Sequence, residues 1–185
     1  YDATFYVMNS SFDVYKCIDN NGGAASTVEP SGNKSTSVFT TGDSYRWKYM
    51  YSLTASEQTN FLSSDFMHVS TESSDFSTTA GAIEHVKITA AGSGGTNGTY
   101  TGVNIRGDGS SGTATVVVSG NAVTSVTITA AGSGYTFASI LASDIGSVSG
   151  ADIDFIISPT GGHANDCEKE LGAFFVMVNQ DIVQN

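Results

Sequence analysis

The stretch Val86-Lys-Ile-Thr-Ala-Ala-Gly-Ser-Gly-Gly95 returns forty residues later as Val126-Thr-Ile-Thr-Ala-Ala-Gly-Ser-Gly-Tyr135. A repeat of this length is typical of one supersecondary unit. Each copy opens with apolar residues at alternate positions, which predicts a strand with one apolar face. Glycine tolerates a positive φ, so the Ala-Ala-Gly-Ser-Gly that follows is expected to end each strand in a sharp turn or bulge. The glycines concerned are Gly92, Gly94, Gly132 and Gly134.

The repeats mark off an inserted domain. The two copies, about 82–118 and 122–157, each read as strand, glycine turn, strand, loop and strand. Because composition changes on both sides of the pair, we expect residues 81–157 to be a small inserted β-repeat domain. Residues 1–80 and 158–185 would then form one discontinuous, β-sandwich-like domain. The alternative is a continuous β-sandwich in which the repeats supply ordinary strands.

Composition and charge narrow the class of protein. The 185 residues suffice for a sizeable core without disulfides. With 21 glycines, two prolines and abundant Val, Ile, Thr, Tyr and Phe, the chain is predicted to be mostly β. A net charge of −11 disfavours a nucleic-acid surface and favours solubility. No apolar stretch approaches the roughly 18 residues of a membrane span, so no membrane partner is expected.

The strand expected over residues 45–53 carries the largest aromatic side chains. Two-residue alternation places one set of residues on a single face: Tyr45, Trp47, Tyr49, Tyr51 and Leu53. One buried aromatic side chain covers about 150–250 Å², so this face is predicted to anchor the core of the outer domain. The alternative is an exposed aromatic row that stacks on sugar rings.

The sequence also predicts two short helices and several further strands. Thr54 and Glu57 fit a capping box for a helix that runs to about residue 62. The second helix is expected to have Asn165 as N-cap and to stop at Gly172. Further strands are expected over residues 4–8, 12–18, 66–69 and 173–179. The last contains Phe174 and Phe175 and is apolar enough to be buried on both faces or to form a contact between subunits.

No catalytic, cofactor or metal site is predicted. Cys17 and Cys167 are expected to be unpaired buried thiols, since two cysteines do not make a disulfide framework. His163 precedes the expected N-cap, so its spacing of four from Cys167 does not predict a catalytic pair. The remaining histidines, His68 and His85, stand in separate segments.

Two stretches that contain aspartates lack the pattern of a strong ion-binding site. The loop Gly107-Asp-Gly-Ser-Ser-Gly112 lacks the lysine of a phosphate loop and the alternating acids of a calcium loop, so it is read as a plain connection. Asp152 and Asp154 share a strand face and could bind a cation weakly with Asp144. The simpler interpretation of these aspartates is a solvent-facing side of the strand.

Three segments together resemble a known family: Val14-Tyr-Lys-Cys-Ile-Asp19, Gly42-Asp-Ser-Tyr-Arg-Trp-Lys-Tyr-Met-Tyr51, and Phe61 to Val69 after a short helix. Their order is similar to the baseplate wedge subunit of contractile-tailed phages of the T-even type, known as gene product eight. The closing Gly-Gly-His, Glu-Leu-Gly and Phe-Val-Met-Val-Asn segments resemble marine relatives of that subunit. The likeness covers the outer segments, a little over half of the chain, and does not extend to the repeats.

The resemblance implies a structural, non-enzymatic protein of the virion, assembled in the host cytoplasm. It also implies a homodimer that binds other baseplate wedge proteins, with no catalytic residues and no cofactor. The rival interpretation is a carbohydrate-binding or adhesin-type β module, and a hydrolase comes third. Exposure of Tyr45, Trp47 and Tyr49 separates the first two, because a sugar platform needs the aromatic row at the surface.

Overall fold

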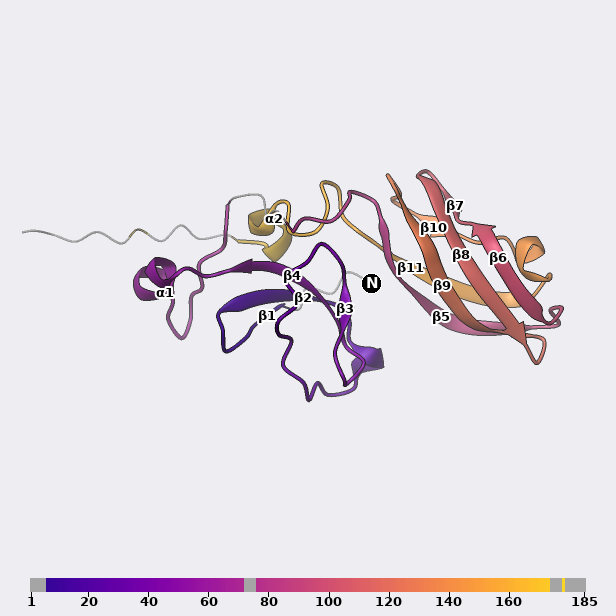
Figure 1. Ribbon diagram of the computed structural model, residues 1–185, viewed down its shortest axis with the longest axis horizontal. Coiled ribbons are helices and arrows are strands. Elements are labelled where there is room, and N and C mark those ends of the chain that lie inside the picture. The colour runs from indigo at the N-terminus through magenta and orange to yellow at the C-terminus, as the bar shows by residue number, and fades with distance from the viewer. Residues whose placement is uncertain (1–5, 72–75, 174–177, 179–185) are drawn as a thin grey trace, which may run out of the picture. The chain divides into compact units, whose positions relative to one another are not determined.

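The computed structural model describes residues 6–71, 76–173 and 178. Strands predominate over two α-helices in this part of the chain, which confirms the mostly-β class (Figure 1). The chain divides into two compact units. We call residues 78–163 the repeat unit, and residues 2–77 with 164–185 the outer unit.

One antiparallel sheet with the strand order β1-β2-β4-β3 forms the centre of the outer unit. Its strands are β1 (Tyr6–Met8), β2 (Asp13–Asp19), β3 (Phe39–Thr40) and β4 (Arg46–Ser52). β2 and β4 are buried on both faces rather than on one. Their near-continuous hydrophobic and aromatic sequence reflects this position, because a strand covered on both sides has no polar face.

A bulge in β4 divides the aromatic face that the sequence predicted. Val14 pairs with Tyr51 and Tyr15 pairs with Tyr49, so Met50 is one extra residue in β4. An extra residue reverses the alternation of side chains beyond it. Tyr45, Trp47 and Tyr49 therefore lie in one core cluster, and Tyr51 and Leu53 lie in another with Met50. The prediction of a single five-residue face was wrong for this reason.

The two helices of the outer unit follow their capping residues. α1 (Ala55–Phe61) has Thr54 as N-cap, and Glu57 completes the predicted capping box. α2 (Cys167–Leu171) stops at Gly172, which has a φ of 65° as a left-handed C-cap requires. Its N-cap is Asp166, whose side chain accepts a hydrogen bond from Lys169 N, and not Asn165 as predicted.

Two predicted strands need separate comment. Residues 66–69 form no strand, although Met67 and Val69 pack against the core cluster that contains Val14. Their apolar pattern reflects packing of an irregular segment, which periodicity alone does not distinguish from a strand. The strand predicted over 173–179, with Phe174 and Phe175, lies almost entirely outside the described residues.

The repeat unit consists of packed antiparallel sheets. One contains β6 (Gly98–Asn104), β8 (Ser110–Ser119) and β9 (Ala122–Ser133), and a second contains β5 (Ile83–Ser93) and β11 (Ser149–Ile157) (Figure 1). The short strands β7 (Arg106–Gly107) and β10 (Ala138–Ser139) pair with each other. A 3-10 helix over Ala142–Ile145 precedes β11.

The two repeats exchange strands. β5, the first strand of the first repeat, pairs with β11, the last strand of the second. β9, the first strand of the second repeat, pairs with β8, the last long strand of the first. Both pairings carry a register shift at the same place, between Asp152 and Ile153 in one and between Thr113 and Ala114 in the other. The repeats therefore complete each other's sheets in the same way.

The Ala-Ala-Gly-Ser-Gly stretches begin inside the strands instead of ending them. β5 runs on to Ser93 and β9 to Ser133, past Gly92 and Gly132. Both of these glycines have a positive φ, 70° and 62°. The chain turns only afterwards, at Gly94 and Gly134, whose φ values of 72° and 74° agree with the predicted turn. The expectation that the whole motif ends the strand was therefore wrong.

The repeat unit enters and leaves at one place. Ser158 N donates to Ala82 O at 2.8 Å, and Thr78 N donates to His163 O at 3.0 Å. Adjacent ends are what an insertion into another domain requires. β8 and β9 are the repeat equivalents of β11 and β5. They are joined directly by the two-residue turn Gly120–Asn121, at the position that corresponds to the ends of the repeat unit.

The two glycines of one motif differ in what surrounds them, which gives a matched test. A Cβ on Gly132 would lie 2.7 Å from Gly112 N, whereas a Cβ on Gly134 would meet nothing closer than 3.9 Å. We expect Gly134→Ala to cost about 1 kcal/mol from the positive φ alone. Gly132→Ala should cost about 3 kcal/mol, because close packing adds to the same backbone strain. Urea unfolding of the two variants measures the difference, and equal losses would contradict the pairing of β9 with β8.

Candidate functional site

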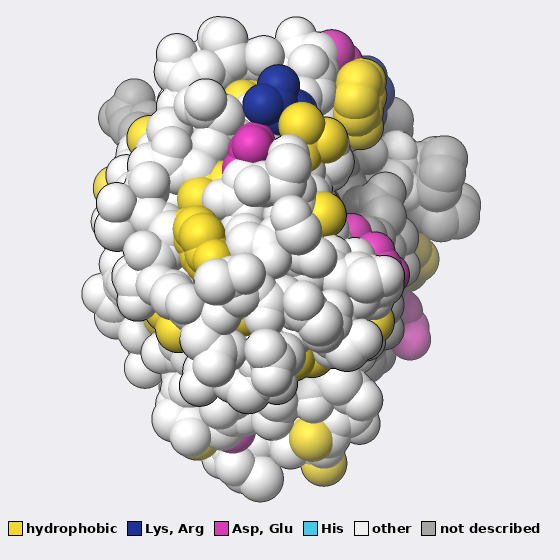
Figure 2. All heavy atoms as spheres, turned by 90° about the vertical axis from the view of Figure 1, so that its right-hand side faces the viewer, with side chains coloured by type: hydrophobic (Ala, Val, Ile, Leu, Met, Phe, Trp, Pro, Cys, Tyr) yellow, Lys and Arg dark blue, Asp and Glu magenta, His cyan; other side chains and the backbone are white. Residues whose placement is uncertain are grey.

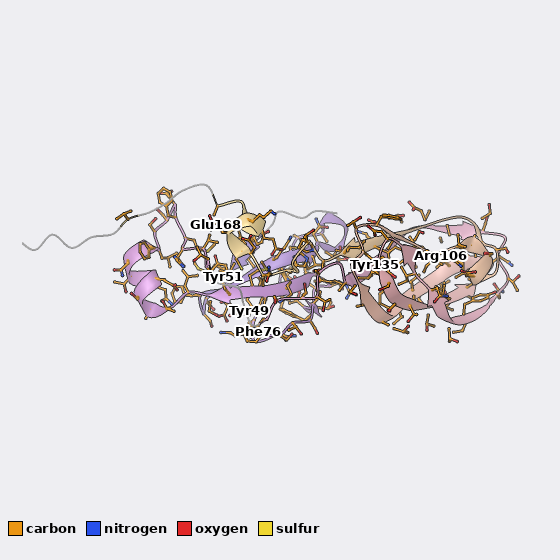
Figure 3. The ribbon with its side chains drawn as sticks, turned by 90° about the horizontal axis from the view of Figure 1, so that it is seen from above. Tyr49, Tyr51, Phe76, Arg106, Tyr135 and Glu168 are labelled. Carbon is orange, nitrogen blue, oxygen red and sulfur yellow. The ribbon has the colours of Figure 1, made fainter. Side chains whose placement is uncertain are left out.

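Tyr45 and the aromatic residues of the adjoining β4 lie in the interior. Tyr45, Trp47 and Tyr49 are 7%, 1% and 5% exposed. The rings of Tyr45 and Trp47 stack at 5.6 Å, and the ring of Phe76 meets that of Tyr49 edge-on at 5.2 Å (Figure 3). Tyr51 is 6% exposed and its hydroxyl donates to His68 O at 2.9 Å. A flat exposed row for stacking sugars is therefore absent from this strand.

A polar loop over residues 24–41 is fixed beside these rings by one carboxylate. Asp43 accepts hydrogen bonds from Thr41 Oγ1, from Ser26 Oγ at 2.8 Å and from Thr27 N at 2.8 Å. The bond from Thr41 is the main cause that holds the pKa of Asp43 well below its usual range. The loop thus has defined anchors despite its Ser- and Thr-rich sequence.

Two lysines are buried opposite each other in the same sheet. Lys16 of β2 pairs with Lys48 of β4, and both side chains are almost fully covered. Like charges opposite each other destabilise a sheet. Each is therefore matched separately: Lys16 Nζ lies 2.9 Å from Glu170 Oε1, and Lys48 Nζ donates to three backbone carbonyls. The Lys16–Glu170 pair joins β2 to α2, two segments far apart in the sequence.

Tyr135 is the central side chain of the repeat unit. It is 2% exposed, accepts a hydrogen bond from Gly112 N at 3.1 Å, and donates one to Ile105 O at 3.0 Å. Its ring fills space that side chains at Gly109 and Gly112 would occupy, since a Cβ there would lie 2.8 Å or less from ring or hydroxyl atoms. Figure 3 shows Tyr135 among the strands of the repeat unit. These glycines thus form a cradle for the ring. The loop predicted over residues 107–112 is shorter in the structure, because Gly107 lies in β7 and Gly112 in β8, which leaves Asp108 and Gly109 as the connection.

At the equivalent place in the first repeat, a different side chain fills the space. Gly95 stands where Tyr135 stands in the second copy, and its backbone N donates to Asn121 O as Tyr135 N donates to Gly81 O. A Cβ on Gly95 would collide with the side chain of Val148. The first repeat therefore has a glycine and the second a tyrosine at equivalent positions, and the two halves of the core are not interchangeable.

The residues that flank β10 carry the exposed large apolar side chains among the described residues of the repeat unit. Phe137 is 60% exposed and Leu141 is 44% exposed. Arg106, which pairs with Ser139 across the β7–β10 ribbon, makes an ion pair with Asp144 at 3.2 Å. Figure 2 shows an end view in which basic, acidic and hydrophobic side chains lie together on a surface that is otherwise mostly uncharged. Aromatic and Arg side chains are enriched in protein interfaces.

The cysteines are free thiols buried on opposite faces of the outer sheet. Cys17 lies in the cluster of Trp47, and Cys167 lies in that of Met50. Burial raises the pKa of each thiol to about 11. A thiol with this pKa is almost entirely protonated at neutral pH, which makes it a poor nucleophile.

His68, His163 and the three aspartates do not come together in a catalytic or metal site. His163 and Glu84 form a buried pair at 3.3 Å, while His68 lies 3.1 Å from Glu57. α2 begins at Cys167, so no helical spacing connects His163 with that thiol. Among the described residues no three His, Cys, Asp or Glu side chains are grouped as a metal ion needs, and this includes Asp144, Asp152 and Asp154.

A hollow of about 280 Å³ opens beside the edge strand β1. Val7, Met8, Val28, Pro30 and Trp47 supply its apolar lining. Glu29, the acidic residue at its rim, already accepts a hydrogen bond from Ser10 N at 2.5 Å. The hollow can hold an apolar side chain, and its contacts show no arrangement for chemistry.

Comparison with protein-family models, curated proteins and solved structures gave no match to this chain. No helix in the described residues is long and apolar enough to cross a membrane.

The sequence did not predict the role of Tyr135 or the exposure of Phe137 and Leu141. Alignment of the repeats offered a signal for the first, because Tyr135 replaces Gly95 in an otherwise matching motif. Gly92, Gly94, Gly132 and Gly134 belong to one unit, and the aromatic residues Trp47, Tyr49 and Tyr51 of β4 belong to the other together with Tyr45. The structure therefore provides two separate sets of residues rather than one site.

Tyr135→Phe should destabilise the repeat unit by about 2 kcal/mol, because it leaves Gly112 N and Ile105 O buried without their partner. Tyr100→Phe is the matched control. Its hydroxyl donates to Thr96 O at 2.8 Å near the surface, where water replaces the bond, so a loss under about 0.5 kcal/mol is expected. Urea denaturation followed by circular dichroism measures both, and equal effects would argue against the cradle.

Proposed function

We propose that this chain is a structural subunit of a phage tail baseplate wedge of the T-even type. It acts in the virion by binding neighbouring wedge proteins and performs no chemistry. The observation that carries the proposal is the burial of Tyr45, Trp47 and Tyr49. Rings packed in a core hold a scaffold together, whereas a carbohydrate-binding module needs them at the surface. The rival adhesin function loses its main platform on this ground.

The segments behind the family resemblance pack against one another, which supports the proposal. Val14–Asp19 contributes most of β2, and Gly42–Tyr51 contributes most of β4, its direct neighbour in the sheet. The Glu-Leu-Gly segment contains Glu170, the partner of Lys16. These segments meet in one sheet and in the two core clusters that cover its faces, so their joint occurrence in the sequence has a structural reason.

The proposed partners are other wedge proteins and a second copy of the chain. On the repeat unit, Phe137 and Leu141 with the Arg106–Asp144 pair offer an apolar contact without net charge. Such a patch matters for a chain of net charge −11, since that charge repels other acidic proteins. The proposed place of assembly is the host cytoplasm.

Purification from phage-infected cells tests the function directly. A tagged chain should retain other tail baseplate proteins, identified by mass spectrometry, through a wash at moderate salt. A Phe137→Glu variant should retain them less well if this patch contributes, and Phe66→Glu, at a site 48% exposed in the outer unit, is the control for added charge. Recovery of glycans or of cell-surface polysaccharide, with no tail protein, would support the adhesin instead.

The complete protein is expected to be a homodimer held mainly by the outer unit. Stable subunit contacts often bury about 2,000 Å² or more and are less charged than the general surface. The chain joined from Ser77 to Ala164 through two glycines, which lacks residues 78–163, should remain dimeric because the ends of the repeat unit are adjacent. Light scattering coupled to size exclusion measures both proteins. A monomer at tens of micromolar for the complete chain would refute the dimer.

A further inference from the structure

Neither repeat forms a closed structure alone. The first repeat supplies β5, β6, β7 and β8, and the second supplies β9, β10 and β11. The hydrogen-bonding partner of each first strand comes from the other repeat. Removing one repeat therefore removes a partner from each remaining sheet.

Both core clusters of the repeat unit are shared between the repeats. In one cluster, Val116 and Val118 of the first repeat pack with Ile145 and Val148 of the second. In the other cluster, Ile83, Ile105 and Ala114 of the first repeat pack with Tyr135 and Phe155 of the second. A single repeat would thus expose an apolar face, which is a strong drive to association.

The exchange obeys a two-fold relationship. Each of the eight residue pairs between β5 and β11 has a counterpart between β9 and β8, shifted by forty residues in the first strands and thirty-nine in the last. For example, Val86 with Phe155 corresponds to Val126 with Val116. Reciprocal pairing of this kind is the pattern of a two-fold dimer that exchanges identical elements.

We propose that the repeat unit is an internally closed dimer, and that the binding partner of a single repeat is the complementary repeat of a second copy of this chain. When both repeats are present in one chain, each supplies the strand partners and the apolar surface that the other needs. When one is missing, the free strands of the other remain available to a second molecule, in the register seen here.

Tyr135 and its cradle make this pairing selective. The phenol of the second repeat needs Gly107, Gly109 and Gly112, all of which belong to the first repeat. In a pair of second repeats, Ala151 stands at the place of Gly112, where a Cβ would lie 2.8 Å from the hydroxyl oxygen. In a pair of first repeats, Gly95 replaces the tyrosine and leaves the cradle unfilled. A first repeat with a second repeat is therefore the favoured combination.

Two variants of the full chain test the proposal. Deletion of residues 120–158 joins Ser119 to Pro159 and keeps the first repeat. Deletion of residues 82–121 joins Gly81 to Ala122 and keeps the second. Ser119 corresponds to Ser158 in the other repeat, so it can precede Pro159 as Ser158 does. Gly81 corresponds to Asn121, so it can precede Ala122 as Asn121 does.

A tag on the first-repeat chain should capture the second-repeat chain in a 1:1 ratio after coexpression. The chain lacking residues 78–163 is the control, since it retains any contact made by the outer unit. Tyr135→Ala in the second-repeat chain should weaken the extra capture about a hundredfold, the usual scale for truncating a buried aromatic side chain.

If a single repeat does not fold alone, circular dichroism can still report pairing, because strands formed on mixing add to the strand signal. Two unfolded single repeats that gain strand signal on mixing support the proposal, as does a complex of folded ones. Capture no greater than that of the control, or no complex and no gain of strand signal, would overturn it. So would a Tyr135→Ala chain that is captured as well as its parent.

Discussion

β5 with β11 and β9 with β8 are two copies of one strand pairing, and the repeat unit depends on both being formed. β5 has its hydrogen-bond partners in β11, 56 to 74 residues further along the chain, rather than within its own repeat. Such pairing is costly in chain entropy before it is complete. The direct β8–β9 turn at Gly120–Asn121 lowers this cost for one pair, since it brings these two strands together locally.

Close approach of backbones sets the positions of the glycines around this pairing. Gly92 and Gly132 lie inside long strands at a positive φ, and each would drive a Cβ into the backbone of the partner strand. Gly109 and Gly112, around the start of β8, have a different reason, which is room for the ring of Tyr135. Glycines that look alike in the sequence therefore serve backbone packing in one place and side-chain packing in another.

The outer unit rests on a different arrangement, in which β2 and β4 are covered on both faces. One face holds the stacked and edge-on rings around Trp47 and Tyr49, and the other holds Met50, Tyr51 and the first residue of α2, Cys167. The bulge at Met50 divides the aromatic residues between the faces. Lys16 and Lys48 are accommodated because each has its own acceptors, Glu170 for one and backbone carbonyls for the other. A scaffold that binds other proteins, as we propose, gains from such a fixed core.

Local chemistry in the sequence determined the class of the fold, the two long repeat strands, the Thr54–Glu57 capping box and the stop at Gly172. Each of these depends on neighbouring residues, through alternation, capping or the freedom of glycine. Tertiary structure alone decided which strand pairs with which. The same alternating pattern suits a partner within the repeat or in the other repeat, and only packing of the two apolar faces separates these choices. It also decided the bulge at Met50, because the side on which Tyr51 is buried depends on the register with Val14. For the same reason the importance of Tyr135 emerged only when the glycines of the first repeat were placed around it.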